Sequence, residues 1–203
     1  MSKKDKVSHG RLRINRGTLR GRYLKFAEYP GVRPTLSRVR EAVFNILADY
    51  AETHGFVDLC AGSGAMGFEA WSLGFDPVWL LDQQAEVIAM LRDQAESLDA
   101  KVVLQRQDAQ RLARRGLPDG AWVLYADPPY QVKRFHEKMM KRLSECAQVH
   151  EGSLYVAEQE TLKFVEKAGV FELVKSRKYG RVHIGVYAKG ATPVEEESED
   201  EAG

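Results

Sequence analysis

The sequence predicts an α/β fold, a doubly wound and mostly parallel seven-stranded sheet with a C-terminal antiparallel hairpin and a small N-terminal β-hairpin. Short apolar runs alternate with amphipathic segments of helical period from residue 56 onwards. Glycines follow the first apolar run, which carries an aspartate near its end, and an aspartate follows each of three later runs. Strands joined by right-handed helical crossovers form a parallel sheet, so these observations together predict the fold.

The N-terminal region is expected to hold a ribbon. Residues 1–10 are expected to be disordered. Between residues 11 and 26 arginines alternate with apolar residues, and Gly17 and Gly21 interrupt the run. This pattern favours a small β-hairpin that presents arginines.

The body is expected to begin with a helix. Thr35 or Ser37 can cap it, with Val39 on its buried stripe and Arg40 toward its flank. A short Arg-rich helix is expected around Leu112. The other expected strands are 56–60, 78–81, 101–104, 122–126, 153–157, 171–176 and 182–187, and the other expected helices are 68–73, 86–98, 135–147 and 161–168.

Charge divides the chain into three regions. Residues 1–40 hold 12 Lys/Arg and 2 Asp/Glu, whereas residues 190–203 hold no Lys/Arg and 6 Asp/Glu. We therefore expect three segments, a basic arm at 1–34, a folded domain at 35–189 and a disordered acidic tail at 190–203. A basic arm before a nearly neutral body favours a polyanionic partner, although a solvated tail would have the same composition.

Composition excludes several classes of protein. With 44% hydrophobic residues the chain can build a core, so global disorder is excluded. The sequence contains no run of about 18 apolar residues, so no membrane span is predicted. Two cysteines in apolar patterns indicate buried thiols in a reducing compartment, so the chain is expected to be cytoplasmic, and we expect a monomer. The five histidines show no ligand spacing, and no metal is expected.

Four aspartates fall after predicted strands. They are Asp58, Asp82, Asp108 and Asp127. Because the carboxyl ends of parallel strands meet at one edge of the sheet, these acids are expected to line one crevice. Any single one could instead cap a helix.

The segment Gly62-Ser63-Gly64 and Gly67 predicts a strand–turn–helix nucleotide site. Glycine permits unusual backbone angles and lets a ligand approach the main chain. Asp82 lies 20 residues after Gly62, a spacing that suits a carboxylate on ribose hydroxyls. An NAD-dependent oxidoreductase would share these features.

The segment Asp127-Pro128-Pro129-Tyr130 is the sharpest signal. Two prolines make the loop stiff and leave it with acceptors but no donors. Such a loop suits a substrate amine held by Asp127 and the carbonyl of Pro128, with Tyr130 stacked on the base. A merely rigid turn is the alternative.

Together these motifs resemble the AdoMet (S-adenosyl-L-methionine)-dependent methyltransferases that act on exocyclic amines, which have a Rossmann-like fold. Three stretches resemble the RsmD family, bacterial enzymes that methylate a guanine N2 amine of 16S ribosomal RNA. They are Arg13-Ile14…Gly17…Arg20-Gly21-Arg22, Arg33-Pro34-Thr35…Arg38-Val39-Arg40-Glu41…Phe44-Asn45…Leu47, and Gly62-Ser63-Gly64-Ala65-Met66-Gly67-Phe68-Glu69-Ala70. The resemblance covers roughly residues 11–188. The chain departs from it at Asp82-Gln83-Gln84 and at Arg16, where a glycine is common.

The resemblance implies guanine 966 of 16S ribosomal RNA as the target, in the assembling small subunit. It implies that AdoMet is held at its methionine end by Asp58, Ala61, Gly62 and Gly64, at its ribose by Asp82 and at its adenine by Asp108. Asp127, Pro128 and Tyr130 would receive the guanine. The RNA contacts are expected from Arg11, Arg13, Arg16, Arg20, Arg22, Arg33 and Arg38.

Three other functions stay open at this point. An NAD-dependent oxidoreductase leaves the Asp127 loop and the basic arm without a role. A DNA adenine-N6 methyltransferase shares the amine chemistry but normally carries a target-recognition domain for which the chain has little room. A non-catalytic RNA-binding protein would not need acids at all four strand ends.

Overall fold

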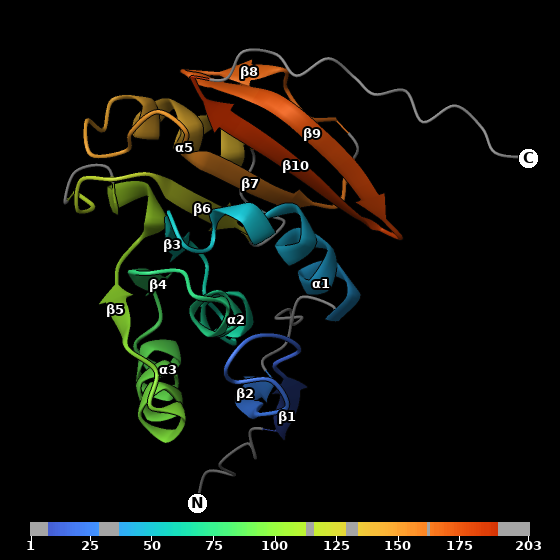
Figure 1. Ribbon diagram of the computed structural model, residues 1–203, viewed down its shortest axis with the longest axis vertical. Coiled ribbons are helices and arrows are strands. Elements are labelled where there is room, and N and C mark those ends of the chain that lie inside the picture. Colours follow the sequence, from blue (N-terminus) through green and yellow to red (C-terminus); the bar gives the residue numbers. More distant parts are fainter. Residues whose placement is uncertain (1–7, 29–36, 113–115, 129–133, 162, 191–203) are drawn as a thin grey trace, which may run out of the picture.

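The computed structural model describes residues 8–28, 37–112, 116–128, 134–161 and 163–190 (Figure 1). The strands are β1 (Ser8–Arg13), β2 (Tyr23–Glu28), β3 (Gly55–Asp58), β4 (Val78–Asp82), β5 (Val102–Arg106), β6 (Trp122–Ala126), β7 (Leu154–Gln159), β8 (Lys167–Ala168), β9 (Phe171–Tyr179) and β10 (Val182–Lys189). The helices are α1 (Ser37–Ile46), α2 (Ala65–Leu73), α3 (Ala85–Leu98) and α5 (Phe135–Ser144), with the short 3-10 turns η1 (Ala48–Tyr50) and η2 (Ala109–Arg111). No helix in these ranges is long and apolar enough to cross a membrane.

The central sheet has the predicted doubly wound topology. Its order is β5-β4-β3-β6-β7-β10-β9-β8, and the five strands from β5 to β7 are parallel. Strand β10 runs antiparallel to both β7 and β9, which confirms the predicted C-terminal hairpin. The chain crosses from one half of the sheet to the other between β5 and β6, so the ends of β3 and β6 border the expected crevice.

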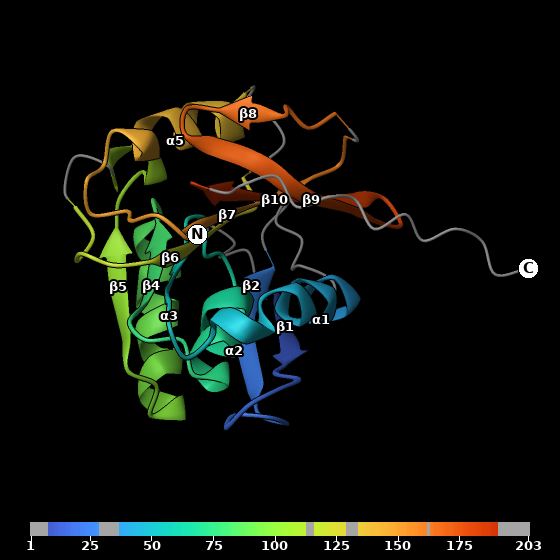
Figure 2. The same cartoon turned by 45° about the horizontal axis from the view of Figure 1, so that its top comes forward.

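Helices cover both faces of the sheet (Figures 1 and 2). Side chains of α1, α2 and α3 form one core cluster with inward residues such as Phe56 and Tyr125. Side chains of α5 form the other with residues such as Leu124 and Tyr155. Successive strand residues alternate between the two clusters, as the period of two requires.

The prediction of a helix over 161–168 is wrong. Among the described residues of that segment Lys167 and Ala168 form β8, an eighth strand at the sheet edge that pairs with Phe171 and Glu172. The ring of Phe164 packs over Gly185, where a Cβ would come within 2.7 Å of it. Packing against β10 therefore overrides the local helical period of this segment.

The N-terminal ribbon is the predicted hairpin, and it extends further than predicted. Strands β1 and β2 pair from Ser8↔Glu28 to Arg13↔Tyr23, so residues 8–10, expected to be disordered, form part of a strand. The hairpin buries Leu24 and Phe26 in the core cluster of α2 and α3 or beside it. Burial of these apolar side chains explains why the ribbon is ordered.

Ser72 at the end of α2 fastens the hairpin loop. Its hydroxyl donates to the carbonyl of Arg16 (2.6 Å) and accepts from the N–H of Leu19 (2.8 Å). Gly17 lies between them with φ +72°, and a Cβ there would approach the Ser72 carbonyl oxygen to 1.7 Å. The loop therefore needs glycine at this position.

Arg40 does not lie on the flank of α1, as predicted, but is buried with 1% exposure. Its Nε donates to Glu69 of α2 at 3.0 Å, and an NH2 group donates to the carbonyl of Arg13 at 2.7 Å. A buried guanidinium requires such partners because desolvation is otherwise costly. Arg40 thus joins α1, α2 and the hairpin.

Candidate active site

Four neighbouring strands end in acids on one face of the sheet. In spatial order, Asp82 ends β4, Asp58 ends β3, Asp127 directly follows β6, and Glu158 is the last residue but one of β7. Ala126 pairs with Ala157, so the next residues, Asp127 and Glu158, lie side by side. Each acid stands two residues after a residue of the α1–α2–α3 core cluster and so faces the same side.

The thiol of Cys60 lies within electrostatic reach of all four predicted aspartates. Burial raises the pKa of the thiol, and the charges of Asp58, Asp127, Asp82 and Asp108 raise it further. The charges of all four acids thus act on one thiol at the carboxyl edge of the sheet.

The turn after β3 carries the predicted glycines. Gly62 and Gly64 have φ of +48° and +78°, which side chains rarely adopt, and Gly64 caps α2. Among the described residues, a Cβ at Gly62 would meet only the Cys60 carbonyl oxygen, at 3.9 Å, so these residues leave the space before Gly62 open. The Ala61 N–H donates to the carbonyl of Leu81 at 2.8 Å, which ties the turn to β4.

Asp82 holds this turn from the neighbouring strand. Its Oδ2 accepts from the N–H of Gly62 at 3.1 Å, and its Oδ1 accepts from the N–H of Gln84 at 2.9 Å. The side chain remains partly exposed, so its other lone pairs face the open space.

Asp58 lies beneath the turn and is buried with 2% exposure. Burial raises the pKa of its carboxyl to about 7, although hydrogen bonds from the N–H groups of Cys60 and Gly67 oppose the shift. The carboxyl would gain from a cationic partner, because an opposite charge offsets the cost of burying the ionised form.

Asp127 and Glu158 form an acidic pair. Burial raises the pKa of Asp127 to about 8, and the charges of Glu158, Asp58 and Glu160 add to the shift. Burial also raises the pKa of Glu158, whereas a hydrogen bond from the phenol of Tyr125 lowers it. Each carboxyl of the pair therefore keeps its proton to a higher pH than an isolated carboxyl does.

Glu158 is a member of the site that sequence reasoning missed. No glycine or proline follows it, and only the acid at the end of a buried strand could have indicated its place. Its main-chain carbonyl lies 3.2 Å from Nε2 of His136, whose Nδ1 lies 3.0 Å from the Tyr155 hydroxyl. Burial lowers the pKa of His136 to about 4, so this histidine is neutral and orients the end of β7.

The structure describes only some of the remaining predicted pocket residues. Asp108 caps η2, its Oδ1 accepting from the N–H of Gln110 at 2.8 Å, so the capping alternative describes its observed contact. Pro128 is buried. Tyr130 lies outside the described residues. Within the described ranges no three side chains of His, Cys, Asp or Glu converge as a metal-ligand set.

The predicted RNA-binding arginines fall into two groups. Arg16 donates to Asn45 of α1, and Arg22 donates to the Ser97 carbonyl at the end of α3 (3.1 Å), so both fasten the hairpin to the body. The others described are exposed, and they are Arg11, Arg13, Arg20 and Arg38. The Arg11 guanidinium lies 4.8 Å from the ring centre of Tyr23. Arg33 lies outside the described residues.

Comparison with known proteins shows that nearly the whole chain resembles one protein family. The sequence profile of a family described as Conserved hypothetical protein 95 matches residues 12–188. The Escherichia coli K12 protein named Ribosomal RNA small subunit methyltransferase D is 35% identical over 133 residues, which are 64% of this chain and 66% of that protein.

Solved structures show the same fold. The Escherichia coli protein yhhF is 26% identical with a TM-score of 0.75, over 89% of this chain and 98% of that chain. An RNA methyltransferase from Salinibacter ruber in complex with S-adenosyl-L-homocysteine is 17% identical with a TM-score of 0.59, over 81% and 98%. The matched profile spans both hairpins, the glycine turn and the row of acids. The chain therefore belongs to this family, the RsmD family of ribosomal RNA methyltransferases.

Proposed function

We propose that the protein transfers a methyl group from AdoMet to the exocyclic N2 amine of guanine 966 in 16S ribosomal RNA. The observation that carries the proposal is the row of acids on β4, β3, β6 and β7. It supplies carboxylates for a cofactor at one end and for an amine at the other. Family membership supports ribosomal RNA as the substrate.

The residues around the glycine turn fit AdoMet. The open space before Gly62 admits a ligand close to the main chain, and Asp82 can accept hydrogen bonds from ribose hydroxyls while it holds the turn. Asp58, buried beneath the turn, would stabilise the ammonium of the methionine part. Asp108, Ala61 and Gly64 complete the proposed contacts.

AdoMet supplies a methyl group on a sulfonium that is already activated. The protein must therefore position the amine and accept charge rather than generate a nucleophile. Asp127 and the carbonyl of Pro128 would accept the two N2–H groups and turn the nitrogen lone pair toward the methyl carbon. As the C–N bond forms and the S–C bond breaks, the amine loses one proton, which the Asp127 carboxylate takes and passes to solvent.

A raised pKa suits Asp127 for this role. A carboxylate of ordinary pKa holds a proton weakly near neutral pH, whereas one near 8 binds it well while still ionising in part. A non-catalytic RNA-binding protein would have no use for the half-buried Asp127 beside the buried Glu158, because desolvation of each acid costs stability.

Nucleoside mass spectrometry of 16S ribosomal RNA tests the proposal. RNA from cells without the gene should lack N2-methylguanosine at position 966, and the wild-type gene should restore it. The gene with Asp127→Asn should not, because the amide loses the charge that accepts the proton. The control Asp119→Asn, at an exposed acid outside the row, should restore it. Unchanged N2-methylguanosine after deletion would overturn the assignment.

A further inference from the structure

The turn end of the β9–β10 hairpin carries four cations that lie outside the row of acids. Lys175, Arg177, Lys178 and Arg181 are exposed. None of them takes part in an ion pair with a described residue, whereas Lys167 at the outer strand pairs with Glu172. Hairpin residues 171–189 contain five Lys/Arg and one Asp/Glu. Lys175, Arg177 and Lys178 lie in the second half of β9, and Arg181 lies in the turn before β10. Four cations without a described acidic partner at the end of one hairpin create a positive potential that attracts a polyanion.

The register of the sheet places this turn at the same edge as the row of acids. His183 of β10 pairs with Gln159, the last residue of β7, so the residues between β9 and β10 project beyond the carboxyl ends of the parallel strands. Strand β7 separates β10 from β6, which puts the start of β10 about 10 Å from the end of β6. The turn end of the hairpin therefore lies at the same edge of the sheet as Asp127, with β9 one strand beyond β10.

Two of the cations also share the face of the acids. Arg177 and Lys175 pair with Ile184 and Val186, whose side chains belong to the core cluster of Tyr125. Paired residues of antiparallel strands project to the same side. Lys175 and Arg177 therefore project on the side of the sheet where Asp127 opens.

We propose that the turn end of the β9–β10 hairpin, with Lys175, Arg177, Lys178 and Arg181, is a second phosphate-binding surface that holds the RNA backbone beside the target nucleotide. The partner is the phosphodiester backbone rather than a base, because exposed Lys and Arg on a turn supply charge without a shaped pocket. The inference rests on the proposed action on RNA.

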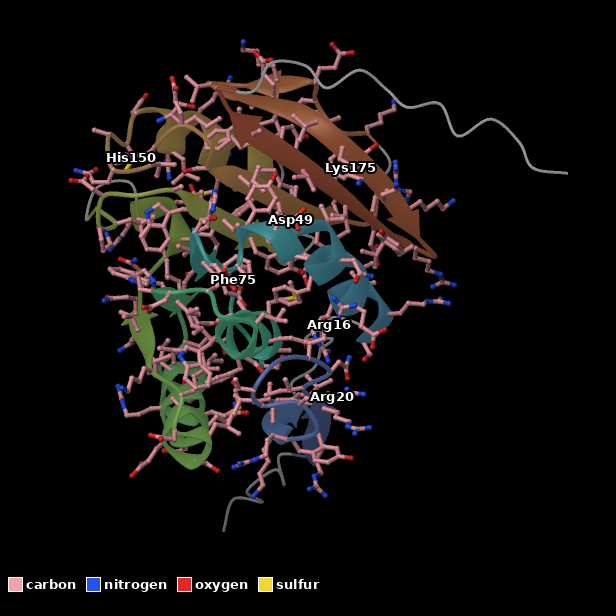
Figure 3. All side chains as sticks on the ribbon, in the orientation of Figure 1. Arg16, Arg20, Asp49, Phe75, His150 and Lys175 are labelled. Atoms are coloured by element: carbon pink, nitrogen blue, oxygen red, sulfur yellow. The ribbon has the colours of Figure 1, made fainter. Side chains whose placement is uncertain are left out.

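The N-terminal hairpin alone leaves this side of the site without phosphate contacts. Figure 3 shows Lys175 on one side of α1, with Arg16 and Arg20 on the other. The loop of that hairpin is fastened to the far ends of α2 and α3, through Ser72 and Ser97. An RNA strand bound at both places would cross the exposed start of α1, where Arg38 lies.

Salt-dependent binding of labelled 16S ribosomal RNA tests this surface. The variant Arg177→Gln/Lys178→Gln removes one guanidinium and one ammonium from the turn. The variant Arg92→Gln/Lys101→Gln removes the same charges from α3 and from the residue before β5, at the opposite edge of the sheet. We expect the turn variant to flatten the slope of log K against log salt by about 1.4–1.8, and the control to leave it unchanged.

AdoMet binding and methyl transfer distinguish a failure of the phosphate-binding surface from a failure of the proposed reaction. The turn variant should bind AdoMet as tightly as wild type does by calorimetry, since no turn residue contacts the glycine loop. An unchanged salt slope in the turn variant would overturn this inference while leaving the methyl transfer intact. If the turn variant flattens the slope of log K against log salt but the wild-type protein forms no N2-methylguanosine, the phosphate-binding surface is supported and the proposed reaction is wrong. If the wild type binds neither 16S ribosomal RNA nor small subunits, the surface is wrong as well.

Discussion

The phenol of Tyr125 donates a hydrogen bond to Glu158 across two neighbouring strands, inside the face that holds the row of acids. Tyr125 precedes Asp127 by two residues on β6, and Glu158 lies beside Asp127 at the end of β7. The bond favours the ionised form of Glu158, whose negative charge in turn raises the pKa of Asp127. Tyr125 and Glu158 therefore tune the acid that is proposed to accept the amine proton.

This arrangement predicts the pH dependence of methyl transfer. If Asp127 acts as a carboxylate, the single-turnover rate should rise with pH as its carboxyl ionises near a pKa of about 8. Glu158→Gln removes the neighbouring charge, which lowers the pKa of Asp127 and should move the rise to lower pH by roughly one unit. The amide oxygen can still accept from Tyr125.

Glu160→Gln is the matched control for this prediction. Glu160 is exposed, and its charge makes the smallest contribution to the shift at Asp127. Its variant should move the profile less than Glu158→Gln does. Profiles that coincide for wild type and Glu158→Gln would show that Glu158 does not act on Asp127.

A second prediction concerns stability at Asp58. Its pKa is about 7 in the folded protein and 3.8 as its ordinary value, so the folded state holds a proton that the unfolded chain releases. Stability due to this group is therefore lost as pH rises from 3.8 to 7. Asp58→Asn cannot ionise, so the difference in unfolding free energy, variant minus wild type, should be larger at pH 8 than at pH 5. We expect a change of roughly 2–3 kcal/mol.

Urea unfolding of the cofactor-free protein at the two pH values measures this difference. The exposed Asp93→Asn, on α3, serves as the control for loss of one carboxylate. Because Asp58 is also the proposed partner of the AdoMet ammonium, the same variant should bind AdoMet more weakly. A difference that is the same at pH 5 and pH 8 would refute the burial of an ionisable Asp58.

A third prediction concerns Asp82. Asp82→Ala removes the proposed ribose acceptor and should weaken AdoMet binding by about 1.5–3 kcal/mol, or roughly 10- to 150-fold. It also removes the acceptor for the N–H of Gly62. Asp82→Asn retains one oxygen for that N–H and should lose less affinity. Calorimetry with equal affinities for wild type and Asp82→Ala would reject the assignment.

A fourth prediction separates the two tasks of the N-terminal hairpin. Arg11 and Arg20 are exposed and make no described hydrogen bond to the body, so Arg11→Gln/Arg20→Gln should flatten the salt slope of RNA binding by about 1.4–1.8. The unfolding free energy should stay within about 0.5 kcal/mol of wild type. Unaltered RNA binding would show that these arginines are only solvated.

Leu24→Ala should have the opposite effect in the same hairpin. Leu24 is 1% exposed in the core cluster of α2 and α3, so its truncation should cost about 2–5 kcal/mol of unfolding free energy. Deleting the hairpin would expose this part of the core. Point substitutions therefore test RNA binding better than truncation does.

Local signals in the sequence determined most strand positions, the edge of the sheet that carries the acids and the N-terminal ribbon. The period of two in the strands, the glycines after β3 and the prolines after β6 are short-range features that predict where strands end. Parallel strands share one carboxyl edge, so the positions of Asp58, Asp82, Asp108 and Asp127 along the chain were enough to predict that they lie at that edge. The N-terminal ribbon was predictable because arginines and apolar residues alternate in it.

The tertiary structure decided what depends on residues distant in sequence. Glu158 joins the site only because β7 pairs with β6, and no motif near residue 158 signals this. Arg40 is buried because Glu69 and the Arg13 carbonyl meet it from two other elements, whereas its place on α1 suggested the flank. Residues 167–168 form a strand rather than a helix because Phe164 packs over Gly185. In each case a contact across the fold outweighs a local preference of the chain, and such contacts cannot be read from one segment alone.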